Sequence, residues 1–309
     1  MLLQGKNKMK ISIIIPAWHE EKIIVRTLDA LKQLNYPLKE CELIIIASTD
    51  DQTYLIAKRK RMREFGKYLV LNQKLGGKNT ALQQGIKKSK GEIIVLLDAD
   101  TLVDKNWLSE VISPLKEDYY CANGNWFPLE KSWLNNYSMI EKVWGRQVLN
   151  QQSANGGGGI AFKRGIIDKI GLERLFDKKI HVGVDHYFGE QFIRNGDKIH
   201  FAKNAKTRTF LNKTFKGFIR DNLRWKKGYF DLISKTRAFM IVGFNLFIVL
   251  SLAFIPYSFI QCLLSAIVSD LSLALYFPVY LFLALIDRSL TIYAAFSRKK
   301  QEIHFKGER

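Results

Sequence analysis

Short apolar runs alternate with segments of helical pattern from the start of the chain to about Arg237. Uninterrupted runs of Ile, Leu and Val are typical of buried strands. We therefore expect strands at residues 11–15, 43–46, 68–71 and 93–97. Helical spacing follows each of the first three, at about 20–34, at 53–65 and from the Gly76-Gly77 turn to about Ser89. This alternation predicts an α/β domain with a mostly parallel sheet and helices on both faces.

Beyond Arg237 the pattern changes to long uncharged runs. Residues 238–268 carry no charged side chain, which exceeds the roughly 20 residues that a spanning helix needs. The run at 271–286 reaches that length only if its helix continues through Asp287 and Arg288 to Phe296. A buried hairpin of a soluble protein is the alternative. The length favours a C-terminal transmembrane helical hairpin, with helices at about 238–268 and 271–296.

Basic residues flank these two runs, whereas the connector Ser269-Asp270 has none. They are Lys226, Lys227, Lys235 and Arg237 before the runs and Arg298, Lys299 and Lys300 after them. The positive-inside tendency then places both ends in the cytoplasm. Residues 1–8 lack the apolar core of a signal peptide. We expect a multi-pass protein of the cell membrane whose large domain is cytoplasmic.

The formal net charge of +19 has two interpretations. Nucleic-acid binding is disfavoured because no recognition motif or aromatic platform accompanies the charge. An anionic membrane surface and a diphosphate substrate fit better, given the apolar C-terminal region. Residues 214–237 mix aromatic and basic side chains, which predicts a basic amphipathic helix at the interface. An ordinary surface helix is the alternative.

The predicted organisation has four parts: a cytoplasmic domain at 1–213, the interface segment at 214–237, the transmembrane helices at 238–296 and a basic cytoplasmic tail at 297–309. Cys41, Cys121 and Cys262 lie far apart and form no Cys-x-x-Cys pair. Neither a zinc site nor a disulfide framework is therefore indicated.

Two acidic residues, Asp98 and Asp100, directly follow the fourth predicted strand. Open α/β sheets bind ligands at the carboxyl ends of their strands. Two carboxylates beside a diphosphate are suited to Mg²⁺ or Mn²⁺, which take their remaining ligands from phosphate and water. The sequence therefore predicts a site for a divalent ion and a diphosphate at this strand end.

Several motifs in order, from about residue 11 to residue 228, resemble the inverting family 2 nucleotide-sugar glycosyltransferases, which have the GT-A fold. The matching segments are 13–21 (IIIPAWHEE), 76–82 (GGKNTAL), 90–92 (KGE) before the fourth strand, 98–101 (DADT), the glycine loop 155–159 with the return strand 160–164, 184–188 (VDHYF) with Gly196, and 224–228 (RWKKG). Each motif alone is a weak signal, but their shared order and spacing make chance resemblance improbable.

The resemblance implies a role for each matched position. Asp185 falls on the catalytic base of the family, although its position also fits a helix cap. Asp98 and Asp100 fall on the metal site. The nucleotide-sugar-binding positions are Pro16, Ala17, Glu20, Ser48, Lys78 and Asp98, and the acceptor or phosphate region is Gly157, Gly158, Arg224 and Trp225. The glycine loop would let backbone approach a sugar, with a flexible surface loop as the alternative.

Four departures limit the comparison. His19 stands for the usual Asn, and Val184 for the usual Glu beside the base. Residues 46–51 (IASTDD) replace Asp-Asp-Gly-Ser, which leaves the choice between a UDP and a GDP donor open. Asp221 replaces the Gln of the Gln-x-x-Arg-Trp motif, and the chain has fewer membrane helices than an export channel needs. Both points argue against a processive synthase.

The implied function is metal-assisted, inverting, non-processive transfer of a sugar to a lipid-linked or glycan acceptor at the membrane. Asp185 would take the acceptor proton, and the metal ion would stabilise the leaving diphosphate. A catalytically silent scaffold of the same fold is one alternative. A nucleotidyltransferase is another, although it leaves the glycine loop, Asp185 and the Arg-Trp motif unexplained. No nucleic-acid partner is expected, and the oligomeric state is left open.

Overall fold

The computed structural model describes residues 11–73, 76–148, 156–251 and 253–297. These residues form two compact units, the first from 11–127 with 156–209 and the second from 128–148 with 210–251 and 253–297. Several sequence predictions lie outside the described ranges: both terminal segments, Asn155 of the glycine loop, and Arg298, Lys299 and Lys300.

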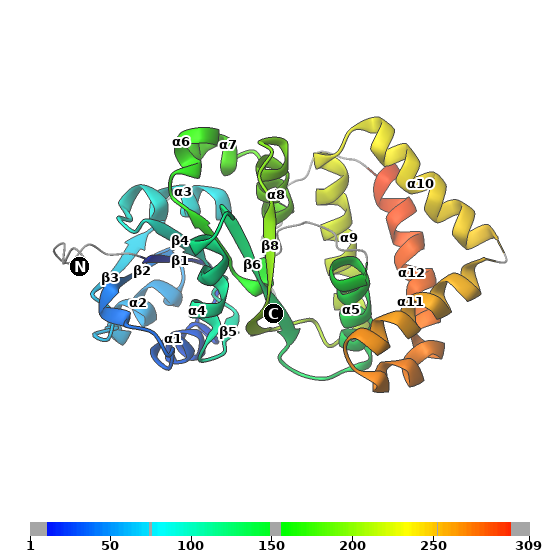
Figure 1. The fold of residues 1–309 in the computed structure, drawn as a ribbon, viewed down its shortest axis with the longest axis horizontal. Helices are drawn as coiled ribbons and strands as arrows, with labels where there is room; N and C mark the ends of the chain where they lie inside the picture. The colour runs from blue at the N-terminus through cyan, green and yellow to red at the C-terminus, as the bar shows by residue number, and fades with distance from the viewer. Residues whose placement is uncertain (1–10, 74–75, 149–155, 252, 298–309) are drawn as a thin grey trace. The chain divides into compact units, whose positions relative to one another are not determined.

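The first unit contains an eight-stranded sheet with the order β3-β2-β1-β4-β7-β6-β8-β5 (Figure 1). Its strands are β1 (Ile11–Ala17), β2 (Cys41–Ala47), β3 (Lys67–Asn72), β4 (Ile93–Leu96), β5 (Thr101–Val103), β6 (Cys121–Pro128), β7 (Ile160–Lys163) and β8 (Ile199–Thr209). Strands β3, β2, β1 and β4 are parallel neighbours. Strand β7 pairs antiparallel with β4 and β6, and β5 pairs antiparallel with β8. The predicted α/β class is confirmed, and the four strands expected from the sequence form the parallel part.

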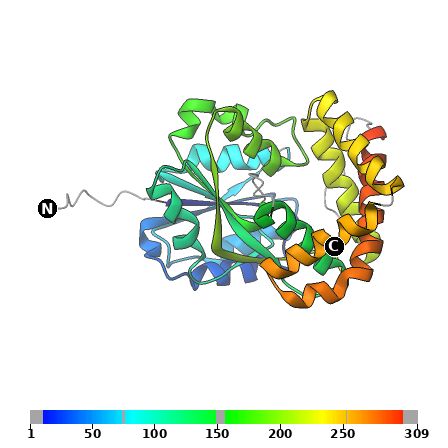
Figure 2. The ribbon, with the colours of Figure 1, turned by 45° about the vertical axis from the view of Figure 1, so that its right-hand side comes forward.

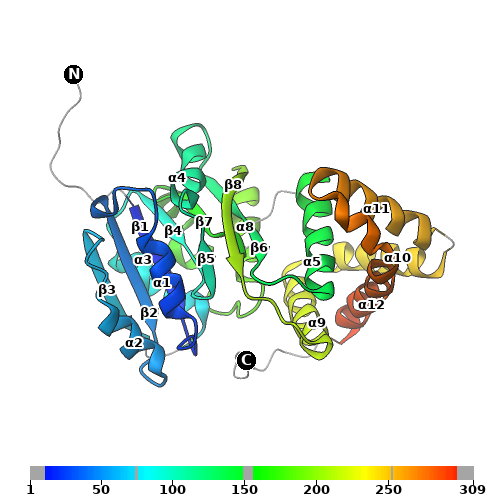
Figure 3. The same ribbon diagram turned by 90° about the horizontal axis from the view of Figure 1, so that it is seen from below.

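Helices cover both faces of this sheet, because alternate side chains of each strand point to opposite sides. Ile13 and Ile45 enter a core on the side of α1, α2 and α4, whereas Ile14 and Ile46 enter a second core on the side of α3 and α8 (Figures 1 and 3). The helices of this unit are α1 (Ile24–Lys32), α2 (Gln52–Lys60), α3 (Lys78–Lys88), α4 (Trp107–Ile112), α6 (Ile166–Ile170), α7 (Leu172–Leu175) and α8 (Val184–Arg194). Burial on both faces explains why the strands read as uninterrupted apolar runs.

Helix α2 is shorter than the predicted segment 53–65. It ends at Lys60 because Arg61 adopts a left-handed backbone conformation with a φ of 44°. An L-residue in that conformation cannot continue a right-handed helix.

The second unit is helical and draws one helix from the middle of the chain (Figure 2). Its elements are α5 (Trp133–Val143), the π-helical turn η3 (Trp144–Val148), α9 (Phe215–Leu232), α10 (Lys235–Leu250), α11 (Phe254–Val268), the 3₁₀ segment η5 (Leu271–Tyr276) and α12 (Phe277–Phe296). Tyr137 of α5 stacks on Tyr280 of α12 and meets Phe218 of α9 edge to face. The three side chains belong to one apolar core.

The predicted helix over 238–268 is divided in the structure. It forms α10 and α11, which are bent by 106° relative to each other. In the described part of the chain, one helical segment, Leu271–Phe296, is long and apolar enough to cross a membrane, or two segments if the bent pair counts as one span. The first run therefore differs from the expected single helix, whereas the second run is a continuous helical segment, and the spanning of a membrane by either run stays a prediction.

Candidate active site

Lys78 joins two carboxylates that lie far apart in the chain. Its Nζ lies 2.7 Å from Oδ1 of Asp98 at the end of β4 and 3.3 Å from Oδ1 of Asp185 on α8. The side chains of Lys78, Asp98 and Asp185 keep 30%, 29% and 27% of their surface exposed, so a ligand can reach all three. The structure thus brings together the predicted base, one predicted metal ligand and the predicted phosphate-binding lysine.

The electrostatics of this cluster favour a bound cation. Burial and the nearby carboxylates Asp185 and Asp100 raise the pKa of Asp98, although the Lys78 ammonium opposes that rise. Burial alone would lower the pKa of Lys78, but Asp185 and Asp98 raise it, so the ammonium stays charged at neutral pH. Three carboxylates near one ammonium give the site an excess of negative charge. A divalent ion would relieve the repulsion among them.

A small pocket opens beside this cluster. It is lined by Pro16, Lys78, Leu82, Leu96, Leu97, Asp98, Ile160 and Asp185. Pro16 comes from β1 and Asp98 follows β4, so the pocket lies at the carboxyl ends of two parallel neighbours. That is the edge at which open α/β sheets bind ligands.

Buried polar side chains that the motif comparison missed hold the walls of the site. The side-chain amide of Asn79 donates to the backbone oxygens of Asp177 and Ile180 at 2.7 and 3.2 Å. The side-chain amide of Gln83 donates to the backbone oxygen of Phe176 at 2.7 Å. These bonds tie α3, which carries Lys78, to the segment before α8. Asn79 and Gln83 lie one helical turn apart, so their polar i, i+4 spacing was the available sequence signal.

Asp185 is in the first turn of α8 and does not cap the helix. The N-cap is Gly183, which adopts a left-handed conformation and provides no side-chain hydrogen bond. The capping interpretation of Asp185 was therefore wrong. Val184 is buried in the adjacent apolar core, which explains an apolar residue beside the base. Gly196 follows the C-terminal end of α8 with a φ of 81°, a conformation that favours glycine.

The loops after β1 and β2 are tied together. The backbone N–H of His19 donates to Oδ2 of Asp51 at 2.8 Å, and that of Glu20 donates to Oγ1 of Thr53 at 2.9 Å. Ala17 and Ser48, at the ends of these strands, are buried. His19 has a φ of 54°, a conformation in which Asn and His are enriched, so the exchange of Asn for His keeps the loop geometry.

Packing against protein accounts for the predicted sugar-binding glycines. A Cβ added to Gly158 would lie 2.1 Å from the backbone oxygen of Gly124 on β6. Trp107 Nε1 donates to the Gly158 oxygen at 3.0 Å, and Thr207 Oγ1 donates to the Gly157 oxygen at 2.6 Å. Close approach of two backbones therefore explains Gly158, whereas a Cβ on Gly157 would lie 3.2 Å from the side chain of Trp126. Their contact with a sugar stays a prediction.

Arg224 and Trp225 belong to α9 of the second unit. Trp225 is exposed, whereas Nη2 of Arg224 lies 3.9 Å from Oδ1 of Asp221. Asp221, which replaces the family glutamine, thus pairs with the arginine of the same motif. The role of Arg224 and Trp225 beside the phosphates stays a prediction.

The residues at the strand end fit a divalent ion that is shared with a substrate. Within the described residues, no group of three or more His, Cys, Asp or Glu side chains is arranged to hold a metal ion. Asp98 and the mostly buried Asp100 supply hard oxygen ligands two positions apart. Such a pair suits Mg²⁺ or Mn²⁺ that completes its coordination with phosphate oxygens and water.

Comparison with known proteins gives a family match over most of the first unit. The family described as "Glycosyl transferase family 2" matches residues 12–181. The "Probable glycosyltransferase YdaM" of Bacillus subtilis is 27% identical over 72% of this chain, and the match spans 56% of that relative. This chain therefore corresponds to little more than half of that relative.

A second relative and a solved structure match along most of their lengths. The Methanococcus voltae "Dolichyl N-acetyl-alpha-D-glucosaminyl phosphate 3-beta-D-2,3-diacetamido-2,3-dideoxy-beta-D-glucuronosyltransferase" is 23% identical over 86% of this chain and 84% of its own. The mannosyltransferase PcManGT of Pyrobaculum calidifontis, solved with GDP-Man and Mn²⁺, superposes with a TM-score of 0.56 at 18% identity, covering 94% of this chain and 76% of its own. At that identity the likeness shows the fold alone, and it confirms the predicted GT-A architecture.

Proposed function

Because the chain belongs to glycosyl transferase family 2, we propose that this glycosyltransferase moves a sugar from a nucleoside diphosphate donor to an acceptor at a membrane surface. Transfer is non-processive and inverts the anomeric centre. The contact of Lys78 with both Asp98 and Asp185 carries this proposal. It brings a candidate base next to the strand end where a diphosphate would bind.

The chemistry divides among the residues of this cluster. Asp185 accepts the proton of the acceptor hydroxyl as the new glycosidic bond forms, and a well-placed base contributes about 10²–10⁴ in rate. The Lys78 ammonium stabilises the negative charge that develops on the leaving diphosphate. One displacement without a covalent intermediate inverts the anomeric configuration.

Asp98 and Asp100 would hold Mg²⁺ or Mn²⁺. When bound, the ion supplies Lewis-acid stabilisation of the leaving diphosphate. The donor set fits this role because both groups are hard oxygen ligands. The presence of Mn²⁺ with GDP-Man in the Pyrobaculum calidifontis structure supports the proposal.

The donor carries UDP or GDP, and the acceptor is a lipid-linked sugar or a glycan. The name of the Methanococcus voltae relative describes action on a dolichyl phosphate-linked sugar, which supports a lipid-linked acceptor. The exposed apolar side chains of the second unit support a position at a membrane, and the basic residues beside the apolar runs support the cytoplasmic face.

A panel of radiolabelled UDP- and GDP-sugars tests the proposal. Each donor is incubated with the purified protein, membrane lipids and Mn²⁺ or Mg²⁺, and the products are extracted into organic solvent. A labelled lipid identifies the donor and the acceptor class together. Asp185→Asn serves as the matched inactive control. Absence of transfer and of donor hydrolysis with every sugar, in a folded protein, would favour the catalytically silent scaffold.

A further inference from the structure

Helix α12 packs against the other helices of the second unit. Its buried side chains include Tyr280, Leu283, Ala284 and Ala294. Its exposed side chains form one narrow stripe at a spacing of three or four residues: Pro278, Phe282, Leu285, Ser289, Tyr293 and Phe296. One side of α12 therefore packs on helices of its own unit, and the exposed stripe is apolar except for Ser289.

Helix α9 lies along α12 over most of its length. Phe218, near the start of α9, shares a core with Tyr280. Farther along, Nζ of Lys226 lies 2.8 Å from Oδ2 of Asp287, and Nζ of Lys227 lies 5.7 Å from the ring centre of Tyr293. Contacts that advance together along both helices mean that the two run side by side in the same direction.

Charged side chains prevent α9 from entering the hydrocarbon of a bilayer. Lys216 and Arg220 are exposed in its first half, and Asp231 is exposed near its end. Exposed charges of this kind are costly in hydrocarbon and occur at the interface instead. Because α12 lies alongside α9, it could cross a bilayer only if it carried these charges across as well.

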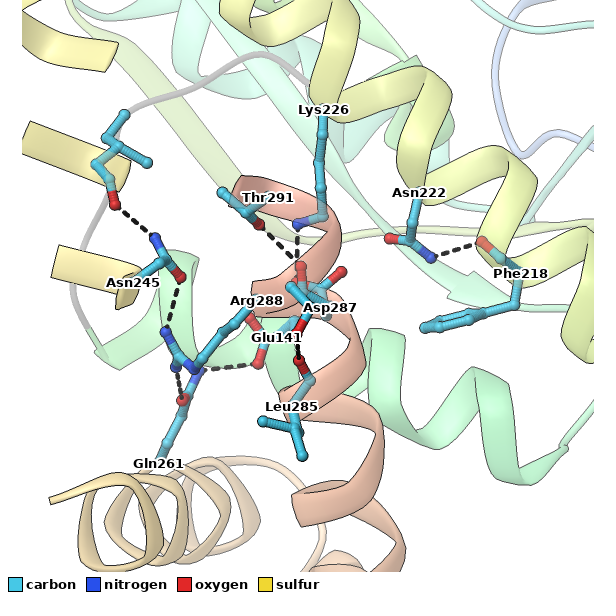
Figure 4. Close-up of polar contacts among 12 residues, drawn as sticks. Glu141, Phe218, Asn222, Lys226, Asn245, Gln261, Leu285, Asp287, Arg288 and Thr291 are labelled. Atoms are coloured by element: carbon cyan, nitrogen blue, oxygen red, sulfur yellow. Dashed lines mark hydrogen bonds and ion pairs between the residues drawn. The ribbon is translucent and has the colours of Figure 1, made fainter. Parts of the chain in front are cut away.

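A polar network fixes α12 to the remaining helices (Figure 4). The guanidinium of Arg288 donates to Oδ1 of Asn245 on α10 at 3.1 Å and to Oε1 of Gln261 on α11 at 3.4 Å. Gln261 Nε2 in turn donates to Oε1 of Glu141 on α5 at 2.9 Å, and Tyr280 also donates to that oxygen, at 2.6 Å. Charged residues such as Asp287 and Arg288 are unusual in a spanning helix. Here both side chains form hydrogen bonds to other helices of a five-helix bundle.

Helices α10 and α11 and the segment η5 form the apolar exterior of this bundle. The two helices contain 16 and 15 residues, which at 1.5 Å per residue gives about 24 and 22 Å, less than the hydrocarbon thickness of about 30 Å. The apolar exterior includes Phe239, Phe247, Leu250, Ile255, Leu271 and Leu275, which are 79%, 64%, 77%, 58%, 70% and 88% exposed. Soluble proteins rarely expose so many large apolar side chains together, which marks this surface as a contact for lipid or protein.

Basic residues beside the apolar exterior identify the partner as a lipid surface. Lys235 and Arg237 are exposed in the first turn of α10, directly before Phe239. Anionic headgroups attract such residues, while the adjacent apolar side chains enter the acyl region below.

We propose that the second unit attaches to one leaflet only: the apolar exterior of α10, α11 and η5 enters the leaflet from the cytoplasmic side, and no helix crosses. This inference rests on the membrane association proposed above and does not depend on the reaction. It differs from the spanning hairpin expected from the sequence in one observable respect. The hairpin would place the connector at Ser269 on the outer face, whereas one-leaflet attachment keeps it inside.

Cysteine labelling distinguishes the two arrangements. Ser269→Cys is compared with Lys88→Cys, an exposed position on α3 of the first unit. The native residues Cys41, Cys121 and Cys262 are buried, so the unchanged protein defines the background. Intact bacterial spheroplasts that express each variant are treated with a membrane-impermeant maleimide. We expect neither variant to react above background in intact spheroplasts, and Lys88→Cys to react once the cells are lysed. Reaction of Ser269→Cys in intact spheroplasts, with Lys88→Cys unreactive, would overturn the proposal.

The depth of insertion gives a second measurement. The environment-sensitive fluorophore NBD is attached to Phe247→Cys or to Lys88→Cys, and vesicles of phosphatidylcholine and phosphatidylglycerol are added. We expect a blue shift for Phe247→Cys only, with at least twofold stronger quenching by shallow nitroxide lipids than by nitroxides near the bilayer centre. Strongest quenching at the centre would overturn one-leaflet attachment. No shift at all would refute membrane association itself, and sugar transfer in solution would remain testable separately.

Discussion

Lys78 and Asp185 are 107 positions apart in the chain, yet Nζ of the lysine lies 3.3 Å from Oδ1 of the aspartate. The same ammonium lies 2.7 Å from Asp98. Lysine from the first turn of α3 thus holds the candidate base and the strand-end carboxylate in one cluster. Most of the reactivity that we expect of this site follows from that arrangement.

Replacement of Lys78 by Met should change the pH dependence of transfer as well as its rate. Loss of the ammonium removes the interaction that opposes the rise in the pKa of Asp98, so this pKa should rise further. Because the ionised carboxylate is needed to hold the metal ion, activity should fall at a higher pH as the solution is acidified. We expect kcat/KM for the donor to drop about 10²–10³-fold. Lys88→Met, on the exposed surface of α3, is the matched control. An unchanged pH profile would contradict this account.

Replacement of Asp185 by Asn should remove the base without disturbing the fold. Gly183 is the N-cap residue of α8, Asn has the size of Asp, and Lys78 keeps its contact with Asp98, so the melting temperature should change by only about 1–2 °C. Turnover should fall about 10²–10⁴-fold if the acceptor reacts through a hydroxyl. Single-turnover kinetics with bound donor measures this loss. A decrease below about tenfold with intact donor binding would instead indicate an acceptor that is already ionised, such as a lipid phosphate.

Chelation should abolish transfer reversibly. Asp98 and Asp100 offer two carboxylates, so the ion depends on the donor diphosphate and on water for its other ligands and should exchange readily. EDTA should stop the reaction, added Mn²⁺ or Mg²⁺ should restore it, and Asp100→Asn should prevent that recovery. Circular dichroism serves as the check that the variant is folded. Full activity in chelator would assign the enzyme to a metal-independent mechanism.

The candidate site was largely predictable because parallel strands end at the same edge of a sheet. Asp98 after β4 and Pro16 in β1 line the same pocket for that reason. The strands of the antiparallel part of the sheet were harder to predict from the sequence. Strand β6 carries Asn123, Gly124 and Asn125 in place of an apolar run. Those residues contact the glycine loop and strand β8 through side-chain amides and a close backbone approach, which a hydrophobic pattern does not reveal.

The organisation of the second unit could not be read from composition. The uncharged run 238–268 predicts one helix by length alone, and its one signal for the division between α10 and α11 is Pro256, which lies in the first turn of α11. The helix α5 joins this unit through contacts such as Tyr280 to Glu141, which are 139 positions apart. Deletion of the chain after Arg237 would therefore expose the apolar faces of α5 and α9 and would not simply release a soluble enzyme.

Gly158 should not tolerate a side chain. A Cβ there would meet the backbone oxygen of Gly124 at 2.1 Å. Because Gly124 belongs to β6, this clash can be relieved only if the strand β6 shifts. We expect Gly158→Ala to cost about 1–3 kcal/mol through overpacking, and a unit of this size loses roughly 2–4 °C in melting temperature per kcal/mol. Gly165→Ala is the matched control, because no atom lies within 4 Å of its added Cβ. Equal melting temperatures for the two variants would refute the packing explanation and would favour the sugar-contact interpretation.

The pair formed by Lys226 and Asp287 should stabilise the second unit more than an exposed pair does. The two side chains are 20% and 14% exposed and lie 2.8 Å apart. Loss of a charged hydrogen bond in such a position costs about 1.5–3 kcal/mol. Asp287→Asn should therefore lower the thermal stability of the protein in detergent and make α9 more sensitive to trypsin. Glu130→Gln is the matched control, since Glu130 and Lys213 form a pair whose side chains are about half exposed, and such pairs contribute about 0–1 kcal/mol.

Exchange of the two charges tests whether the stability lost on substitution comes from the ion pair between Lys226 and Asp287 or from other effects of the new side chains. The double variant Lys226→Asp with Asp287→Lys retains opposite charges on α9 and α12, so it should recover stability that Lys226→Asp and Asp287→Lys each lose. Differential scanning fluorimetry of the parent protein, these two single variants and the double variant shows whether their effects on the melting temperature add, and thus whether the two positions are coupled. If the single losses simply add, α9 is held on α12 by apolar packing around Phe218 and Phe230 alone. A positive coupling would instead show that Asp287, an unfavourable residue for a spanning helix, is retained in α12 because it fixes the amphipathic helix beside it.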